Sequence, residues 1–565
     1  MKITYRLFFV LLLTVWQAWT LSAQEASSSP EEKKDDYFEV SKNIELFVDI
    51  YKELDRYYVD QLDHKKLIQI AIDKMLQSLD PYTNYIPENK VEDFKFQSTG
   101  KYGGIGAIIS KTGKYIEVVE PYEGSPASKA GLRPGDIILR INDVDMVGKD
   151  VQDASELLRG QPGTPVTIFV KRVIGTHADS FDVTVTRAKI HVKNVPFYGM
   201  LDTAEGIGYI RLTNFRQGAA REVRSALEEL KRKGAKKLIL DLRGNPGGML
   251  IEAVMLTNVF IPRNKLVVST KGKVKDWDKT YHTFLDPVDT TMPLVVLINR
   301  GSASASEIVS GALQDYDRAV IMGTESFGKG LVQSVRPLLY NAQMKVTVAR
   351  YLLPSGRWIQ KIDYAHKDRK GRPVIFPDSS SKTFKTMAGR EVKSGRGIHP
   401  DVEVHGDSLP LVARELLNQK LIFGYANLYR NTHDSVPPPP VFEMSNQEYA
   451  DFVAFVDSAD FSYETETKKI LETALEKSRK EGYYEEVKEP LNQLMSRVEA
   501  NENAQLTKHK AIIKELLEQA IMSRYYYMKG RIQESFDRDR QLDSAQAILK
   551  DPARYHRILQ PPSHE

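Results

Sequence analysis

The sequence predicts an α/β fold flanked by helical segments, and three observations support this. From Gly206 onward, apolar strand segments alternate with helical segments, which is typical of an α/β core. Residues 98–190 show strand-like alternation instead, whereas both ends of the 565-residue chain have helical periodicity. A chain of this length has room for about three or four domains.

The N-terminus predicts a secretory signal peptide. Lys2 and Arg6 precede an apolar run at 7–16, and residues 21–23 supply the small side chains that a signal peptidase prefers. The run is shorter than the ~20 residues of a spanning helix, so an uncleaved anchor is the weaker alternative. We therefore expect an exported, periplasmic protein that is not an integral membrane protein after cleavage. If the signal is retained, the protein would be membrane-associated.

The composition narrows the choice of partners and cofactors. Lys and Arg number 79 against 75 Asp and Glu, which gives a net charge of +4 without a long basic run. This balance argues neither for nor against nucleic acid by itself, and we expect no nucleic-acid partner. The chain has no cysteine, which removes disulfides and lipid-modified cysteine. We expect no metal and no cofactor.

Changes in composition and periodicity divide the chain into six segments. They are a signal peptide (1–23), a disordered leader (24–36), an N-terminal helical region (37–97), a strand-rich domain (98–190), an α/β core (191–405) with a polar insertion (361–396), and a C-terminal, mostly helical extension (406–565). The leader is rich in Ser, Glu, Lys and Asp, which is typical of disorder. The charged, helical extension favours a role in packing or assembly.

The strand-rich domain resembles a PDZ domain. It contains the segment Gly-Leu-Arg-Pro-Gly-Asp-Ile-Ile at 131–138, after a glycine-rich stretch at 102–106. In PDZ domains such a loop offers backbone N–H groups to a peptide's C-terminal carboxylate, and the peptide adds as an extra strand. The alternative is that these glycines only form a tight turn. The residues of the expected peptide-binding loop are Tyr102, Gly103, Gly104, Ile105 and Gly106.

Residues 301–333 carry side chains suited to nucleophilic chemistry. Ser302, Ser304 and Ser306 stand where a helix is predicted to begin, and Lys329 lies between two glycines. A serine needs a base to remove its proton, and a desolvated lysine can serve as that base. At a helix start, a neighbouring N–H group can also hold an oxyanion. The pattern alone does not choose among the serines, which are also good helix caps, and Lys329 could equally lie in a surface turn.

Several motifs surround this stretch in order. They are Ser-Leu-Asp-Pro-Tyr-Thr (78–83), Asp-Leu-Arg-Gly-Asn-Pro-Gly-Gly (241–248), Gly-Ser-Ala-Ser-Ala-Ser-Glu-Ile (301–308), Phe-Gly-Lys-Gly-Leu-Val-Gln (327–333), Pro-Ser-Gly-Arg (354–357) and Gly-Ile-His-Pro-Asp-Val (397–402). Over residues 40–405 the chain resembles the carboxy-terminal-processing, or tail-specific, peptidases. The resemblance implies a crotonase-like α/β spiral as the protease core, with an inserted PDZ domain in the form of a partly open β-barrel.

The resemblance also implies roles for individual residues. Ser304 would be the nucleophile, Lys329 the general base, and Gln333 the residue that orients the lysine. Residues four apart on a strand share a face, so Lys329 and Gln333 can point into the same pocket.

Further positions follow from the same resemblance. The oxyanion hole would use the N–H of Ala305 and that of either Gly247 or Gly248. Asp315 would be an auxiliary site residue, although it could equally anchor the end of its helix. Arg159 matches an arginine of the PDZ domain that takes part in gating, although it could equally be a plain surface or capping residue.

These expectations combine into a serine endopeptidase that holds substrate C-termini in its PDZ domain and cleaves through an acyl-enzyme at Ser304. Its partners would be proteins with exposed C-termini, with a second copy of the chain or an adaptor protein as further partners. One alternative is a catalytically silent PDZ scaffold on a hydrolase-like core, which the intact Ser304/Lys329/Gln333 set disfavours. Another is an acyl-CoA enzyme of the crotonase kind, which the PDZ domain and the export signal disfavour.

Overall fold

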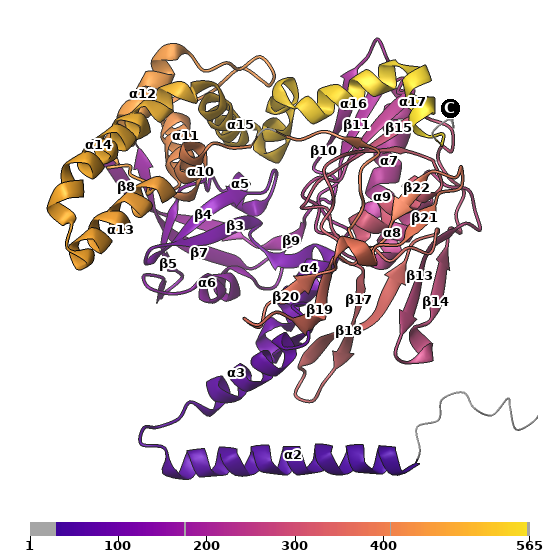
Figure 1. Ribbon diagram of the computed structural model, residues 1–565. Helices are drawn as coiled ribbons and strands as arrows, with labels where there is room; N and C mark the ends of the chain where they lie inside the picture. The colour runs from indigo at the N-terminus through magenta and orange to yellow at the C-terminus, as the bar shows by residue number, and fades with distance from the viewer. Residues whose placement is uncertain (1–29, 175–176, 407, 562–565) are drawn as a thin grey trace, which may run out of the picture. The chain divides into compact units, whose positions relative to one another are not determined.

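The computed structural model describes residues 30–174, 177–406 and 408–561 (Figure 1). The chain divides into two compact units, residues 1–78 and 79–565. The predicted signal peptide at 1–23 lies outside the described residues. Among the described residues, no helix combines the length and the apolar character needed to cross a membrane.

The described part of the first unit, residues 30–78, contains the helices α2 (Pro30–Tyr57) and α3 (His64–Gln77). Asp63 caps α3 by accepting the N–H of Lys66 at 3.0 Å. Because α2 begins at Pro30, the leader predicted to be disordered over 24–36 is wrong for its second half. A polar composition does not distinguish a disordered segment from a solvent-exposed helix, which explains the difference.

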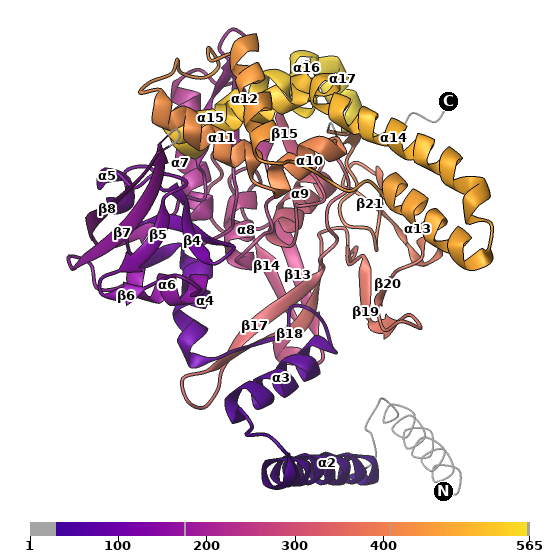
Figure 2. The same ribbon diagram turned by 90° about the vertical axis from the view of Figure 1, so that its left-hand side faces the viewer.

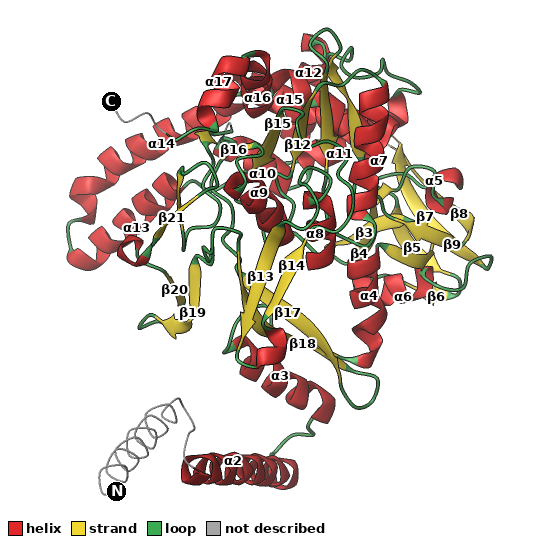
Figure 3. Cartoon of the chain, turned by 90° about the vertical axis from the view of Figure 1, so that its right-hand side faces the viewer, coloured by secondary structure: helices red, strands yellow, loops and turns green. Residues whose placement is uncertain are grey.

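A six-stranded sheet forms the centre of the second unit (Figure 3). Its order is β10-β11-β12-β15-β16-β23, and all neighbouring pairs are parallel except β10 and β11. A helix lies in each connection from β11 to β12, from β12 to β15 and from β15 to β16, as the predicted alternation requires. The elements are β10 (Phe197–Asp202), β11 (Ile207–Arg211), α7 (Ala219–Arg232), β12 (Lys237–Asp241), α8 (Leu250–Thr257), β15 (Leu294–Ile298), α9 (Ala305–Asp315), β16 (Val320–Gly323) and β23 (Val402–Glu403).

Both faces of this sheet are buried, so its central strands are almost continuously apolar. Leu238 and Leu240 of β12 belong to the core that α7, α8 and α9 cover. Ile239, between them, points to the opposite face and packs in a second core with Leu542 and Leu549 from the C-terminus of the chain. The C-terminal extension therefore completes the protease core rather than following it as a separate appendage.

The segment that follows Lys329, the predicted base, forms a strand of a second sheet. Strand β18 pairs with β17 along its length, and with β1 and β13 on its other edge. Two small hairpins, β19–β20 and β21–β22, occupy the predicted polar insertion. The elements are β1 (Asn84–Ile86), β13 (Leu266–Gly272), β14 (Lys279–His282), β17 (Leu331–Pro337), β18 (Gln343–Leu352), β19 (Ile362–Lys367), β20 (Pro373–Ile375), β21 (Thr383–Lys385) and β22 (Glu391–Lys393).

The strand-rich domain is an antiparallel sheet with two short helices and its own apolar core. Strand β2 pairs with β9, which joins the entry and exit of the domain. Helix α4 (Val91–Thr99) immediately precedes it. The elements are β2 (Lys101–Gly104), β3 (Ala107–Thr112), β4 (Tyr115–Pro121), α5 (Pro126–Lys129), β5 (Ile137–Ile141), β6 (Val144–Asp145), α6 (Val151–Leu158), β7 (Pro165–Ile174), β8 (His177–Thr186) and β9 (Ala188–His191).

The C-terminal extension is helical, as predicted, and contacts both the strand-rich domain and the core. Figure 2 shows α11 and α15 above β7, and the hydroxyl of Tyr527 in α15 is 2.6 Å from that of Ser128. At the core, Asp539 forms an ion pair of 2.6 Å with Arg243. The helices are α10 (Leu411–Asn418), α11 (Leu421–Thr432), α12 (Asn446–Ser458), α13 (Glu466–Glu481), α14 (Tyr484–Lys508), α15 (Lys510–Glu534), α16 (Arg540–Lys550) and α17 (Pro552–Ile558).

The substitution Leu542→Ala tests whether the extension belongs to the core. Leu542 is fully buried against the sheet, so we expect the free energy of unfolding to fall by about 2–5 kcal/mol, measured by urea denaturation. Leu339→Ala is the control, because Leu339 is 80% exposed and its truncation should change stability by less than about 0.5 kcal/mol. Equal stability of the two variants would contradict this packing.

Candidate active site

A cleft of about 630 Å³ brings several of the predicted site residues together. The start of α9, the turn after β12 and the inner side of β17 all contribute to it. The predicted residues that line the cleft are Ser304, Lys329, Gln333, Gly247 and Gly248. Residues as far as 86 positions apart in sequence therefore share one cavity.

The structure distinguishes the three serines that the sequence left open. Ser302 is buried and its hydroxyl donates to the carbonyl of Leu242 at 2.8 Å. Ser306 is also buried and its hydroxyl donates to the carbonyl of Asn245 at 2.9 Å. Ser304 is the one of the three that lines the cleft, at the N-cap of α9.

The backbone of Ser304 has φ 55° and ψ −111°, a conformation that costs free energy for any residue with a Cβ atom. The turn at 245–248 packs directly against it. A Cβ atom added to Gly247, whose φ is 95°, would lie 2.9 Å from the Ser304 Cβ and 2.6 Å from the Ala303 carbonyl oxygen. Only glycine fits this position, because the turn at Ser304 leaves no room for a side chain.

Two backbone N–H groups near Ser304 are available as donors, and a third is not. The Gly247 N–H donates to the Asn245 Oδ1 at 2.9 Å. By contrast, no hydrogen bond from the N–H of Gly248 or of Ala305 is found within the part of the chain that the structure describes. The sequence left Gly247 and Gly248 as equal candidates, and this difference separates them.

The surroundings of Lys329 lower the pKa of its side chain. Burial and, to a smaller extent, the charge of Lys345 lower its pKa from 10.5 to about 8, against the opposing charges of Glu307 and Asp80. Its Nζ atom is 4.1 Å from the centre of the Tyr82 ring. A substantial fraction of Lys329 is therefore neutral near pH 8.

The three predicted catalytic side chains share the cleft without being bonded to one another. Among the described residues, no hydrogen bond joins the Lys329 Nζ to the Ser304 Oγ or to Gln333. The Gln333 Nε2 instead donates to the Thr347 Oγ1 at 3.3 Å. The lysine therefore rests against an aromatic ring and must move to reach the serine.

Asp315 lies at the far end of α9 from Ser304, about 16 Å away at the usual helical rise. Its carboxylate pairs with Arg357 at 2.8 Å and accepts the N–H of Ser355 at 2.9 Å. It is not among the residues that line the cleft. These contacts match the helix-anchoring alternative and not the auxiliary catalytic role.

The strand-rich domain has a groove of about 200 Å³ between β3 and α6. Tyr102 and Ile105 of the predicted peptide-binding loop line it, together with Ile109 and Leu158. Gly106, at the end of this loop, has φ 78°, which favours glycine.

Arg159 stands at one end of this groove, next to α4. It pairs with Asp93, and its guanidinium lies over the rings of Phe96 at 5.9 Å and Tyr102 at 5.4 Å. Within the part of the chain that the structure describes, these three partners belong to α4 and β2, and none of them lines the cleft. Helix α4 itself reaches the cleft through Phe94, Gln97 and Ser98, and the ring of Phe96 also lies 5.8 Å from the guanidinium of Arg216.

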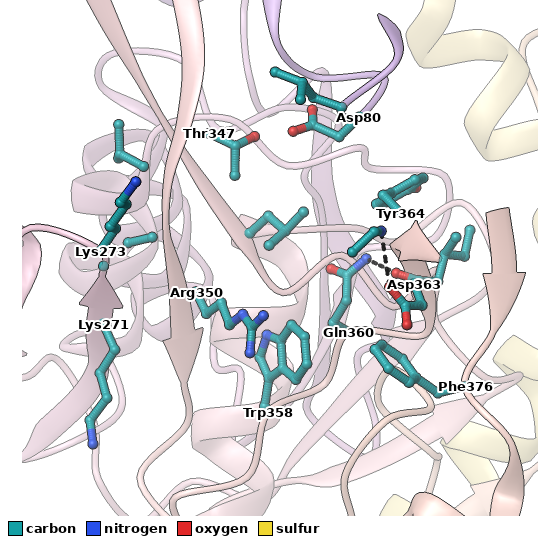
Figure 4. Close-up of a pocket in the computed structure, with 17 residues that line it drawn as sticks. Asp80, Lys271, Lys273, Thr347, Arg350, Trp358, Gln360, Asp363, Tyr364 and Phe376 are labelled. Carbon is teal, nitrogen blue, oxygen red and sulfur yellow. Dashed lines mark hydrogen bonds between the residues drawn. The ribbon is translucent and has the colours of Figure 1, made fainter. Parts of the chain in front are cut away.

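Another cavity, of about 530 Å³, lies beside β18 and holds none of the predicted residues (Figure 4). The Arg350 guanidinium lies 4.5 Å from the centre of the Trp358 ring in its wall. Tyr364, also in the wall, shares a hydrogen bond of 3.0 Å with the hydroxyl of Tyr82. No group of three or more His, Asp or Glu suited to a metal ion lies among the described residues.

Sequence analysis assigned no role to Glu307, Tyr82, Lys345 or Asn245, all of which shape this site. Glu307 had a local signal, because a serine followed three residues later by glutamate matches the capping-box pattern. Lys345 lines the cleft beside β17, with which its strand β18 pairs. Tyr82 comes beside Lys329 because β1, which follows it, pairs with β18, and a single sequence does not reveal that pairing.

Comparison with known proteins agrees with this fold. Family models match at residues 206–366 (peptidase family S41), 117–172 (PDZ domain), 8–90 (N-terminal domain of the activating protease CtpB) and 412–549 (C-terminal helical domain of probable PDZ-proteases).

Individual relatives match over most of their length. The carboxy-terminal-processing protease of Bartonella bacilliformis is 36% identical over 361 residues, which cover 63% of this chain and 80% of that protein. A probable CtpA-like serine protease of Staphylococcus epidermidis is 34% identical over 390 residues, 69% of this chain and 74% of that protein. The solved photosystem II D1 C-terminal processing protease is 28% identical, covers 64% of this chain and 92% of that one, and has a TM-score of 0.35.

The fold, the site and these matches define a serine-type peptidase with a PDZ domain. The chain belongs to peptidase family S41, among the carboxy-terminal-processing proteases. The predicted family and fold class, an α/β core with a PDZ domain and helical segments at both ends, are confirmed.

The close packing of Gly247 against Ser304 gives a direct test of the site. In Gly247→Ala the added Cβ must displace the turn at 303–305, so we expect the rate at which a serine-acylating probe labels the protein to fall by about 100-fold. Gly389→Ala is a matched control, because Gly389 has the same φ of 95° but open space around it. Equal labelling rates in the two variants would contradict the described packing.

Proposed function

We propose that the chain is an endopeptidase in which Ser304 is the nucleophile and Lys329 the general base. The observation that carries this proposal is their common cleft, which holds a strained serine at a helix start and a half-buried lysine with a pKa of about 8. Neutral Lys329 removes the hydroxyl proton as the Ser304 Oγ attacks the scissile carbonyl. The same ammonium then protonates the leaving amine, and water hydrolyses the acyl-enzyme.

We assign the oxyanion hole to the N–H groups of Ala305 and Gly248. Ala305 is the first residue of α9, where backbone N–H groups and the helix dipole favour negative charge. Gly248 is preferred to Gly247, because the Gly247 N–H already donates to Asn245. Two unpartnered donors cost nothing to redirect toward the developing oxyanion.

The proposal includes a rearrangement of Lys329 on binding of substrate. Its Nζ must leave the Tyr82 ring before it can reach the Ser304 Oγ. Lys329 precedes β17, so the predicted strand does not include it, but Gln333, which bonds Thr347 at a long 3.3 Å, lines the same cleft and would orient the lysine there. The described arrangement is thus that of a resting enzyme.

We further propose that the PDZ groove binds the C-terminus of a protein substrate. The peptide would add as a strand beside β3 and place its carboxylate at the loop 102–106. The side chains of Ile105, Ile109 and Leu158 line the groove and favour an apolar last residue. The pattern at 1–23 supports export to the periplasm, and a second copy or an adaptor remains a predicted partner.

The Ser/Lys assignment predicts both a loss of activity and a pH profile. Ser304→Ala and Lys329→Ala should each abolish cleavage of an unstructured protein substrate while leaving binding of a C-terminal peptide unchanged. In the wild type, protonation of Lys329 alone should lower kcat/KM by about fivefold from pH 8 to pH 7, because a protonated Lys329 cannot accept a proton. Proteolysis by pure Ser304→Ala protein would refute the assignment.

C-terminal recognition predicts a dependence on the free carboxylate of the peptide. Amidating the C-terminus of an apolar peptide should weaken its binding by about 10- to 100-fold, because hydrogen bonds to a charged acceptor are lost. Calorimetric titration of the Ser304→Ala protein measures the affinity without cleavage. Acetylation of the N-terminus of the same peptide is the control, and equal effects of the two modifications would refute C-terminal recognition.

A further inference from the structure

Glu307 is a fully buried carboxylate that the proposed mechanism does not use. Its Oε2 accepts the backbone N–H of Ser304 at 2.7 Å and that of Lys329 at 2.9 Å. Its Oε1 accepts the N–H of Gly328 at 2.7 Å and the hydroxyl of Ser326 at 2.5 Å. One side chain thus links the segment of the nucleophile to that of the base, 25 residues further along the chain.

The chemistry of this contact requires an ionised carboxylate. Its two oxygens together accept bonds from four donors, which an amide could not do, since its NH₂ group would face N–H groups. Charge-assisted bonds of this kind are about twice as strong as neutral ones. They offset the cost of the left-handed backbone at Ser304.

The same serine-to-glutamate pattern stands in a plainer form at the start of α12. Glu448 of α12 accepts the N–H of Ser445 at 2.6 Å, three residues before it, just as Glu307 does for Ser304. Ser445, however, has an unstrained φ of −70°. Besides this N–H, Glu448 accepts the hydroxyl of Tyr429 at 2.6 Å and contacts no residue of the cleft. A simple helix cap therefore does not explain the wider set of bonds at Glu307.

We propose that Glu307 is a positioning residue that holds the backbones of Ser304 and Lys329 at a fixed separation through its shared Oε2 atom. This inference rests on the proposed function, in which those two residues are nucleophile and base. Glu307 touches neither the substrate nor the reacting atoms, so it acts through the two residues that it joins.

The charge of Glu307 also affects the protonation of the base. The groups that face Lys329 are Lys345, which lowers its pKa, and Glu307 and Asp80, which raise it, together with the Tyr82 ring. Removing the negative charge of Glu307 should therefore lower the pKa of Lys329. A cleft that merely loosened and admitted water would do the opposite and return that pKa toward 10.5.

Glu307 itself titrates within the working range of the enzyme. Burial raises its pKa to about 7, although its four hydrogen bonds oppose the shift. A protonated carboxyl group accepts fewer bonds, so the contact weakens below pH 7. We expect log(kcat/KM) of the wild type to have a slope of about 1 between pH 8 and 7 and a steeper slope below pH 7.

The experiment compares Glu307→Gln, Glu307→Asp and the matched control Glu448→Gln in the full-length enzyme. Cleavage of an unstructured protein substrate is followed from pH 5.5 to 9. We expect Glu307→Gln to lose at least about 100-fold in kcat with little change in KM. The acid limb of its pH profile, which is the range over which kcat/KM falls as the pH decreases, should move to lower pH. The steeper slope of log(kcat/KM) below pH 7 should disappear. Glu307→Asp keeps the charge but shortens the reach, so kcat should fall while the acid limb stays in place.

Each result decides the proposal. Unchanged kcat in both Glu307 variants overturns it, and so does an equal loss in Glu448→Gln. An acid limb that moves to higher pH in Glu307→Gln also overturns it, because loosening of the cleft then explains the loss. If Glu307→Gln fails to fold, as circular dichroism would show, the Asp variant decides alone. Cleavage by Ser304→Ala would instead overturn the proposed function on which the inference rests.

Discussion

The tight turn between β15 and α9 is the constraint on which the rest of the site depends. Ser304 adopts a left-handed backbone there, and the turn at 245–248 packs against it so closely that Gly247 admits no side chain. A strained backbone conformation of this kind persists only where the contacts around the residue hold it in place. Here the surroundings are two adjacent parallel strands, β12 and β15, whose carboxyl ends bring both turns to the same edge of the sheet.

A series of ion pairs runs from this edge of the sheet to the C-terminal extension. Asp241, at the end of β12, is fully buried and pairs with Arg211 and Arg243. Arg243 in turn pairs with Asp539 before α16. Because breaking one partner of a buried ion pair leaves an uncompensated charge, these contacts couple the turn at 245–248 to the C-terminal extension. The extension also contacts the PDZ domain through Tyr527, so one segment touches both functional domains.

Much of the fold was predictable, because hydrophobic periodicity is a local property of the chain. Helices α7, α8 and α9 cover one face of β12 and α16 covers the other, so both faces of this strand are apolar. The almost continuously apolar sequence of the strand shows this directly. The start of α2 was not predicted, because Glu- and Lys-rich sequence suits an exposed helix as well as a disordered leader. The sequence placed Arg159 in the PDZ domain. It did not reveal that Arg159 contacts α4, because these contacts depend on packing between separate segments of the chain.

The sequence by itself determined the family, the order of the domains and the small set of candidate residues, since ordered motifs survive in a linear chain. The tertiary structure separated Gly248 from Gly247, Ser304 from its neighbouring serines, and Asp315 from the cleft. It also joined Glu307 to both Ser304 and Lys329. Those distinctions depend on hydrogen bonds of about 3 Å between particular donors and acceptors. Such contacts form only when segments that are far apart in the sequence pack together.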